Sequence, residues 1–273
     1  MVRNCFLFSI RHWKQCVKKI DFWLIMAFLL VFYSTFLYNG GVYLRSEGGS
    51  VGIFSFLPIF STNGDFILMT LAGYLMLASD MPIRNREIQF EITRTDKNTW
   101  FLGQLLYSFF ISVTYTLVIS VLPCVFYVGN VVLQNVWGTA VEDGSAFFMD
   151  GVISDYGAVM EQSAGSAWIK AFLLFVCLEM LFAMICCLLN LIAGKGYGVA
   201  ICSLLILMER VLCMFVLDLG YFSPVVLLNR FYKDNGANMV PTVCYFVTII
   251  LALFLLGWRL LRRIDIGIEL SDR

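Results

Sequence analysis

Long uncharged apolar stretches dominate the pattern of hydrophobic and polar positions in this chain. Residues 22–44, 100–128 and 239–258 each lack any Asp, Glu, Lys or Arg. A helix needs about 20 apolar residues to cross a hydrocarbon core about 30 Å thick. These three stretches therefore predict membrane-spanning helices.

Three further stretches are apolar but are shorter or contain charges. Residues 66–79 are uncharged and can be extended backwards through residues 53–64, with Pro58 as a kink or break. Residues 167–192 and 197–217 are long enough to span, although both contain ionisable side chains. The sequence thus predicts an all-α polytopic membrane protein, a single transmembrane domain over residues 1–273, with six transmembrane helices at about 22–42, 60–79, 101–128, 167–192, 197–217 and 239–258.

The composition supports this class and excludes several others. Hydrophobic residues make up 60% of the chain, charged residues make up 14%, and the mean hydropathy is +0.83. An average soluble protein has about 25% charged residues, so this chain could not cover its surface with polar groups in water. The same values exclude disordered, collagen-like and coiled-coil chains. Most of the nine cysteines fall in or beside the apolar stretches, so we expect them to be packing residues rather than disulfides or metal ligands.

The formal net charge is zero, but the charges are sorted along the chain. Fourteen of the 19 Lys and Arg residues lie before the first predicted span, between the second and third, between the fourth and fifth, or after the sixth. Because basic residues accumulate on the cytoplasmic side, both termini are expected in the cytoplasm of a cell-membrane protein. The loop over residues 129–166, which has no Lys or Arg, is then extracytoplasmic.

The N-terminal segment, residues 1–21, has its own pattern. Phe6, Ile10, Trp13, Val17 and Ile20 recur every three or four residues among basic neighbours. This spacing indicates an amphipathic helix that lies in the inner membrane interface. The alternative is an ordinary basic tail.

The chain lacks the motifs of membrane enzymes. Its one histidine, His12, lies in the N-terminal segment, and neither H-E-x-x-H nor a P-loop occurs. No pair of aspartates carries the G-x-G-D motif of intramembrane aspartyl proteases. We therefore predict no catalytic site, no cofactor and no metal in this chain, and no binding of nucleic acid.

Three ionisable residues lie near the middle of predicted spans, where charge is costly. They are Glu179 in the fourth span, and Glu209 and Arg210 in the fifth. Antiparallel neighbouring helices would place Glu179 level with Arg210, which predicts an intramembrane charge pair. The pair could hold the two helices together, or it could form a substrate or proton site. No span shows a polar stripe several residues long, which disfavours an ion-conducting pore lined by these three residues.

The cytoplasmic loop over residues 80–100 is the other concentrated signal. Pro82 suits the start of a helix, and apolar residues alternate with charges of both signs. Such a surface could dock a cytoplasmic partner, or it could be a solvated loop that only fixes topology. The candidate docking residues are Arg84, Arg86, Glu87, Glu91, Arg94 and Lys97.

This layout resembles the permease subunits of type-2 ABC transporters, which are mostly bacterial exporters. The similarity covers the whole chain and rests on the basic N-terminal helix, on two cytoplasmic motifs and on a segment before the last span. The quoted segments are LASDMP at residues 77–82, RTDKNTWFLG at residues 94–103, YFSP at residues 221–224 and WRLLRRIDI at residues 258–266.

The resemblance implies a mechanism and partners. Two permease subunits would pair as a homo- or heterodimer, and separate ATPase subunits would dock on a coupling helix between Pro82 and Trp100. The substrate would be amphiphilic or peptide-like. Two features depart from the family: the outer loop 129–166 is long, and the spans contain more ionisable residues than expected. A membrane scaffold or regulatory subunit that transports nothing is the alternative.

Overall fold

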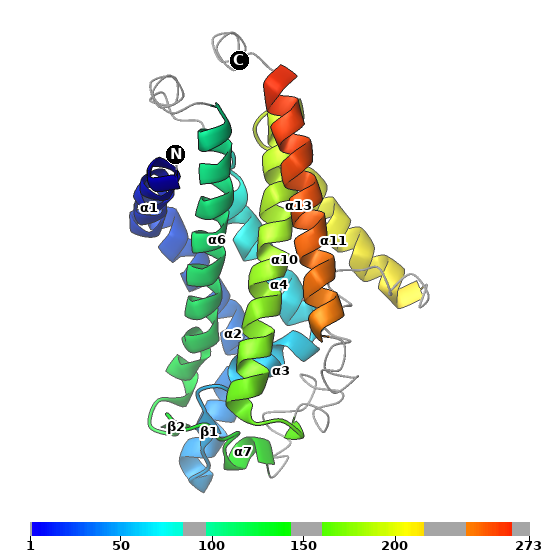
Figure 1. Cartoon of the computed structure of the whole chain (residues 1–273). Helices are drawn as coiled ribbons and strands as arrows, with labels where there is room; N and C mark the ends of the chain where they lie inside the picture. Colours follow the sequence, from blue (N-terminus) through cyan, green and yellow to red (C-terminus); the bar gives the residue numbers. More distant parts are fainter. Residues whose placement is uncertain (1, 84–96, 143–159, 216–238, 264–273) are drawn as a thin grey trace.

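The computed structural model describes residues 2–83, 97–142, 160–215 and 239–263, and this part of the chain is mostly helical (Figure 1). Its helices are α1 (Val2–Lys18), α2 (Ile20–Glu47), α3 (Phe56–Thr62), α4 (Gly64–Ala78), α6 (Lys97–Val121), the 3-10 helix η1 (Leu122–Tyr127), α7 (Thr139–Glu142), α10 (Ala164–Ala193), α11 (Tyr197–Phe215) and α13 (Met239–Arg263). Two short strands, β1 (Val51–Gly52) and β2 (Val131–Val132), complete the described elements.

Four helical stretches are long and apolar enough to cross a membrane. They are α2, α6 together with η1, α10, and residues 240–261 of α13. Each contains an 18-residue window with a mean hydropathy of at least 2.0. Gly64–Ala78 and Tyr197–Met208 are apolar but shorter. The described chain is therefore a helical protein with four candidate membrane-spanning helices.

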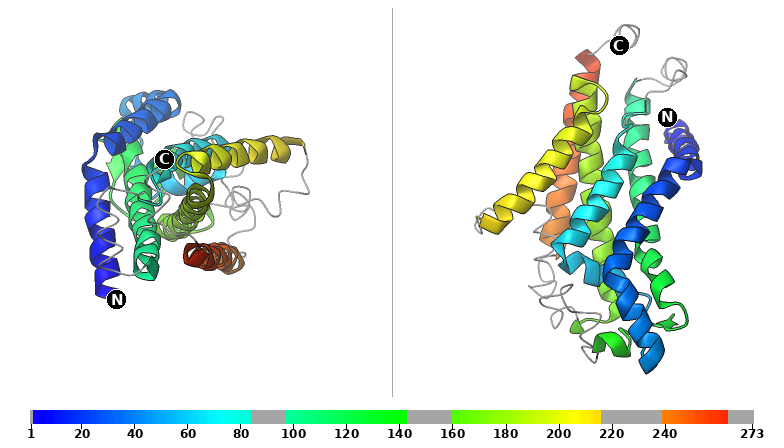
Figure 2. Two further views of the ribbon diagram at one scale, coloured as in Figure 1. Left: turned by 90° about the horizontal axis from the view of Figure 1, so that it is seen from above. Right: turned by 180° about the vertical axis from the view of Figure 1, so that it is seen from behind.

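Helix α10 is the centre of the bundle. Two thirds of its most apolar window, 67%, is buried, whereas only 22% is buried in α13. It packs against α3, α4, α6, α11 and α13, and Figures 1 and 2 show these helices around it. The exposed sides of α2 and α13 are also apolar, with Phe28 and Leu255 among the exposed side chains. Such surfaces suit contact with acyl chains rather than water.

The bundle has two distinct ends. Helix α1, the ends of α4, α10 and α13, and the starts of α6 and α11 lie at one end, here called the α1 end (top of Figure 1). Strands β1 and β2 and helix α7 lie at the opposite end, here called the strand end (bottom of Figure 1). The first and last described residues, Val2 and Arg263, are thus at the same end of the bundle.

The predicted second span is broken at a different residue than expected. Pro58 lies inside α3, and the break falls at Asn63, between α3 and α4. The Asn63 Oδ1 atom accepts hydrogen bonds from the backbone N–H groups of Asp65 at 2.8 Å and Phe66 at 3.4 Å. Asparagine caps the start of a helix in this way because the first N–H groups have no partner within the helix. The expectation of a break at Pro58 was wrong because proline is tolerated in the first turn.

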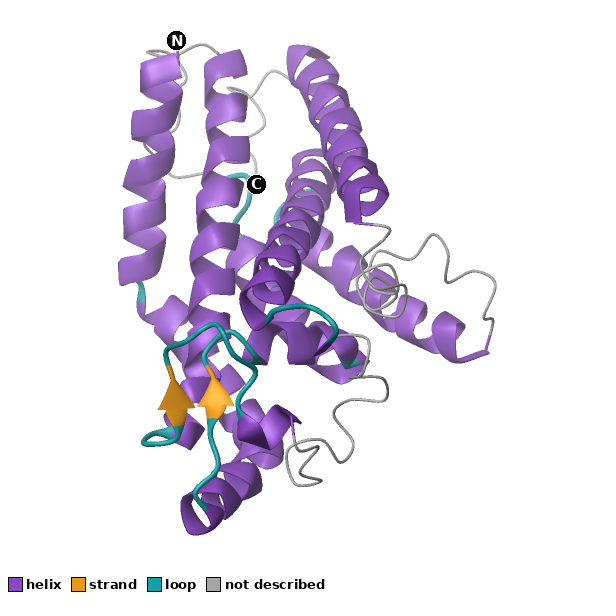
Figure 3. Cartoon of the chain, turned by 60° about the horizontal axis from the view of Figure 1, so that its bottom comes forward, coloured by secondary structure: helices purple, strands orange, loops and turns teal. Residues whose placement is uncertain are grey.

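The strand end is an ordered cap, so the chain is not purely helical. β1 and β2 pair in parallel, with Val51 opposite Val131 and Gly52 opposite Val132 (Figure 3). The Asn130 amide donates to the carbonyl oxygens of Leu44 at 3.0 Å and Gly49 at 2.7 Å. The described residues of the predicted loop 129–166 therefore fold onto the segment that follows α2.

Helix α1 lies across the bundle rather than along it. Figure 1 shows it nearly end-on, and the left view of Figure 2 shows its length beside α6. Its most buried side chains are Cys5, Ser9 and His12, whereas Phe6 of the predicted apolar stripe is 48% exposed. Two members of the predicted stripe nevertheless contact α6: the rings of Phe6 and Trp13 pack against Phe110, and the Trp13 indole N–H donates to the Thr114 hydroxyl at 2.8 Å.

Candidate functional site

A cluster of buried polar side chains lies at the centre of the bundle and joins four helices. Tyr33 comes from α2, Thr70 and Tyr74 from α4, Ser112, Tyr115 and Thr116 from α6, and Glu179 from α10, and all seven are at most 2% exposed. We call these seven residues the buried polar cluster. Polar groups in an apolar surrounding need partners, so their hydrogen bonds define what the cluster does.

Glu179 is the ionisable member of the buried polar cluster. Its side chain is 0% exposed, and its Oε2 atom accepts a hydrogen bond of 3.1 Å from the Thr116 hydroxyl. Its Oε1 atom has no hydrogen-bond partner among the residues that the structure describes. The carboxyl group thus connects α10 to α6.

The tyrosines of the buried polar cluster connect α6 and α2 to α4. The Tyr115 hydroxyl donates to the Thr70 carbonyl oxygen at 2.7 Å, and the Tyr33 hydroxyl lies 3.4 Å from the Thr70 hydroxyl. The hydroxyls of Tyr74 and Ser112 are 2.8 Å apart. In a membrane, an apolar side chain gains little by contacting protein instead of lipid. Polar contacts such as these therefore help to hold α2, α4 and α6 together.

The sequence does contain a polar stripe on one span, contrary to expectation. Gln104, Ser108, Ser112, Thr116 and Ser120 follow one another at four-residue spacing on α6, and all are buried. The hydroxyls of Ser108 and Ser120 donate to carbonyls of their own helix, those of Leu105 and Leu117. Only the middle of the stripe reaches other helices. The signal was missed because apolar residues separate its members, but its helical spacing could have revealed it.

The predicted charge pair lies only partly within the described residues. Glu209 and Arg210 fall in α11, but their side chains are outside the described part of the structure. Near the turn, α10 and α11 are in contact, with the Sγ atoms of Cys186 and Cys202 3.5 Å apart, and α11 diverges from α10 farther along (Figure 1). The pairing of Glu179 with Arg210 stays a prediction.

Most of the predicted docking residues are also outside the described residues: Arg84, Arg86, Glu87, Glu91 and Arg94. Lys97 is the first residue of α6. The ends of this segment are nevertheless held in place. The Ile83 N–H donates to Gln104 Oε1 at 3.2 Å, and the Cys5 thiol of α1 donates to the Thr99 carbonyl at 3.4 Å. Ile83, the last described residue before this segment, and Lys97, the first after it, therefore both lie at α6.

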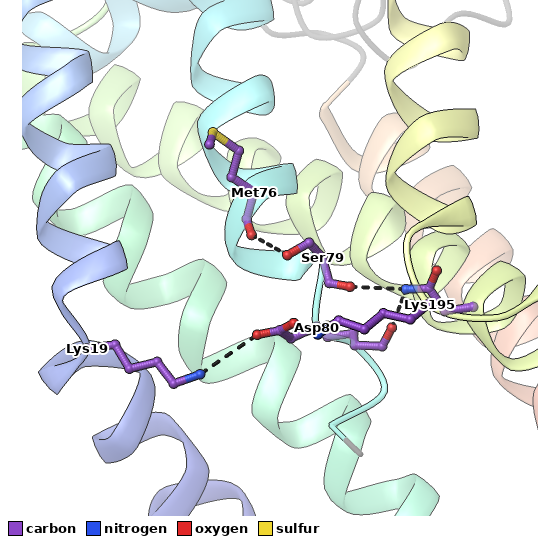
Figure 4. Close-up of polar contacts among 7 residues, drawn as sticks. Lys19, Met76, Ser79, Asp80 and Lys195 are labelled. Atoms are coloured by element: carbon purple, nitrogen blue, oxygen red, sulfur yellow. Dashed lines mark hydrogen bonds and ion pairs between the residues drawn. The ribbon is translucent and has the colours of Figure 1, made fainter. Parts of the chain in front are cut away.

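A cluster of opposite charges lies at the α1 end, and sequence reasoning did not find it. The Asp80 carboxylate lies 2.9 Å from the Lys195 Nζ atom and 3.7 Å from the Lys19 Nζ atom (Figure 4). We call these three residues the rim cluster. The hydrogen bond from Lys195 lowers the pKa of Asp80 below its ordinary value, with a further contribution from Lys19 and against the effect of partial burial.

Asn190 fixes the position of the rim cluster. Its side chain is 2% exposed, and its amide donates to the carbonyl oxygens of Ser79 at 3.2 Å and Met81 at 2.6 Å. Its Oδ1 atom accepts from the Gly198 N–H at 2.8 Å. One buried side chain thus joins the ends of α4 and α10 to the start of α11.

A pocket of about 860 Å³ adjoins the rim cluster and is lined by residues of α1, α2, α4, the segment after α4, α6, α10 and the α10–α11 turn. Its polar lining includes Lys19, Asp21, Asp80 and Lys195, and its apolar lining includes Phe28 and Met76. A volume of this size is within the range of about 300–1,000 Å³ that is usual for small-molecule sites.

Neither a metal site nor a known relative identifies the protein. Within the described ranges, no group of three or more His, Cys, Asp and Glu side chains is placed to hold a metal ion. No protein-family model matches the sequence, and comparisons with curated proteins and with solved structures gave no match.

Proposed function

We propose that this chain is the membrane-spanning permease subunit of an ATP-driven ABC transporter and that it exports an amphiphilic or peptide-like substrate. In this proposal it crosses the cell membrane six times, with both termini and the α1 end in the cytoplasm. ATP is hydrolysed by a separate subunit that docks on residues 84–97, and a second permease subunit completes the pathway.

The arrangement around the docking segment is the observation that supports the proposal most. Helix α1 lies across the start of α6, and the Ser9 hydroxyl is 2.8 Å from the Gly103 carbonyl oxygen. On one side of the docking segment, the Ile83 N–H donates to the Gln104 side chain of α6. On the other side, the Thr99 carbonyl oxygen accepts from the Cys5 thiol of α1. The residues that flank the docking segment are both held at α6. Movement of a bound ATPase can therefore be transmitted to the bundle, because packed helices move as units.

The buried polar cluster suits a bundle that changes shape. It joins α10, the most buried helix, to α2, α4 and α6 through hydrogen bonds that can exchange partners. Glu179 contributes the carboxyl group of this cluster.

Co-purification tests the proposal. The tagged chain, expressed with its neighbouring genes, should retain a P-loop ATPase. Charge reversal of Arg84, Arg86 and Arg94 to Glu should abolish this retention. The control is the reversal of Lys14 and Lys18, which are exposed on α1. It also replaces positive by negative charge at the α1 end. When expressed without the ATPase gene, both variants should elute as the wild-type chain does in size-exclusion chromatography.

Two outcomes would contradict the proposal. If the intact chain repeatedly purifies without any ATPase and its neighbouring genes encode none, the permease assignment is wrong. If an ATPase binds but ATP hydrolysis and transport in reconstituted vesicles do not respond to the triple reversal, the chain is a scaffold or regulatory subunit instead.

A further inference from the structure

The pocket beside the rim cluster has a polar rim and apolar walls. The charged residues of the rim lie at the ends of helices. Lys19 lies between α1 and α2, Asp21 is in the first turn of α2, Asp80 follows α4, and Lys195 is in the turn between α10 and α11. The charged groups therefore lie where these helices would enter a bilayer. That is the level of lipid headgroups.

The apolar walls of the pocket are open to the side. Leu24, Phe28 and Met76 line the pocket, and their side chains are 60%, 53% and 59% exposed. They belong to α2 and α4. In a bilayer these exposed walls would contact acyl chains, so a lipid can enter the pocket without passing through water.

The rim of the pocket carries both signs of charge. Two ammonium groups, those of Lys19 and Lys195, and two carboxylates, those of Asp21 and Asp80, line it. The three side chains of the rim cluster are 52–78% exposed. Exposed ion pairs are weak, because water competes for both partners. A ligand can therefore exchange with them.

This pattern of charge selects among headgroups. A phosphate accepts charge-assisted hydrogen bonds from lysines, and a primary ammonium offers three N–H donors to carboxylates. A headgroup with a phosphate alone would face the two carboxylates without a partner for them. A quaternary ammonium has no N–H donor to offer.

We propose that this pocket binds a phospholipid whose headgroup carries both a phosphate and a primary ammonium, which is the chemistry of phosphatidylethanolamine. The phosphate replaces the Asp80 carboxylate as the partner of Lys19 and Lys195, the ammonium faces Asp80 and Asp21, and an acyl chain lies along Phe28 and Met76. This inference does not depend on the transporter proposal, since it concerns a lipid of the surrounding bilayer.

Native mass spectrometry tests the inference. The purified chain is titrated with phosphatidylethanolamine, phosphatidylcholine and phosphatidylglycerol that share the same acyl chains, and the bound fractions are compared. Phosphatidylethanolamine should bind most tightly. The double variant Lys19→Gln/Lys195→Gln should weaken its binding about tenfold, as expected for the loss of hydrogen bonds to a charged group.

Lys14→Gln/Lys18→Gln is the matched control, because both lysines lie on α1 at the same end and neither lines the pocket. It should bind phosphatidylethanolamine as the wild type does. Equal binding of the three lipids, a preference for phosphatidylglycerol, no bound lipid at all, or an equal loss in the control pair would each overturn the inference.

A second measurement uses the wild-type chain and does not depend on the folding of any variant. Phosphatidylethanolamine with a photoreactive headgroup is added to the protein in vesicles and cross-linked by light. Labelled peptides should contain Lys19, Asp80 or Lys195. Labelling confined to the strand end or spread evenly over the chain would contradict the inference.

Discussion

The Thr116 hydroxyl on α6 donates a hydrogen bond of 3.1 Å to the Glu179 carboxyl on α10. Both side chains are fully buried. The contact therefore links two of the four candidate spans through groups that water does not reach. It also makes Thr116 a direct test of whether the buried polar cluster stabilises the bundle.

Replacing Thr116 by Val should destabilise the protein, because it leaves Glu179 Oε2 without its donor. Unpaired buried groups cost about 1–3 kcal/mol in soluble proteins, and interhelical hydrogen bonds in membranes average about 0.6 kcal/mol. We expect a loss of about 1 kcal/mol, measured by thermal unfolding in detergent with a thiol-reactive dye that reports exposure of the buried Cys186 and Cys187. Thr116→Ser keeps the hydroxyl and should resemble the wild type; an equally unstable Ser variant would contradict this explanation.

The ion pairs of Asp80 should make stability depend on acid pH. The pKa of Asp80 is lowered from its ordinary value of 3.8, first by the hydrogen bond from Lys195. The unfolded chain therefore binds the proton more tightly than the folded chain. The stabilisation by Asp80 is complete above the ordinary value and is lost as pH falls from there through the lowered folded-state pKa.

This effect should be small, below about 1 kcal/mol, because exposed ion pairs are screened by water. It is measured as the difference in unfolding temperature between about pH 6 and about pH 3. Asp80→Asn and Lys195→Gln should each reduce that difference. An unchanged difference in both variants would show that this carboxylate does not contribute.

The contact between α1 and α6 should be sensitive to a side chain at position 103. A Cβ atom on Gly103 would lie 2.6 Å from Cδ1 of Phe8, which is too close for both to keep their places. Gly103→Val should cost about 1–3 kcal/mol and should speed tryptic cleavage at the exposed Lys14. Adding Phe8→Ala should restore part of the loss, since the two positions are in contact. Strictly additive effects in the double variant would mean that the two residues do not meet.

Asn190 should be the most important polar residue at the α1 end. Asn190→Ala leaves the carbonyl oxygens of Ser79 and Met81 and the N–H of Gly198 without this partner. The expected loss is about 1–3 kcal/mol in thermal unfolding. Asn135→Ala is the control, because Asn135 also accepts from a backbone N–H, that of Gly165, but is exposed. A larger loss in the control would contradict the importance of burial.

The strongest sequence signals are uncharged length and the sorting of basic residues. Residues 22–44 and 239–258 lie within α2 and α13, two of the four helices that are long enough to span. These two predictions succeed because crossing a bilayer requires a continuous apolar helix, and the sequence alone shows whether an apolar stretch is continuous. The weaker prediction for the second span placed its break at Pro58, whereas the local hydrogen bonds of Asn63 decide it.

For the candidate sites, packing revealed more than the sequence did. Glu179 could be singled out from the sequence, because a carboxyl group within an apolar stretch is costly and therefore conspicuous. Its partner Thr116 could not be, since a hydroxyl is common in such helices and only packing shows which one faces the carboxyl. The predicted docking segment was also singled out from the sequence, but most of its residues lie outside the described structure.

From the sequence alone it follows that this chain is apolar enough for a bilayer, that its long apolar stretches are helical, and that Glu179 is unusual within them. The packing of the helices is what brings Lys19, Asp80 and Lys195 together beside one pocket and places Asn190 against the backbone around them. The reason is physical. Hydropathy and helix length depend on neighbours along the chain, whereas a polar contact between helices depends on how those helices are rotated and packed against one another.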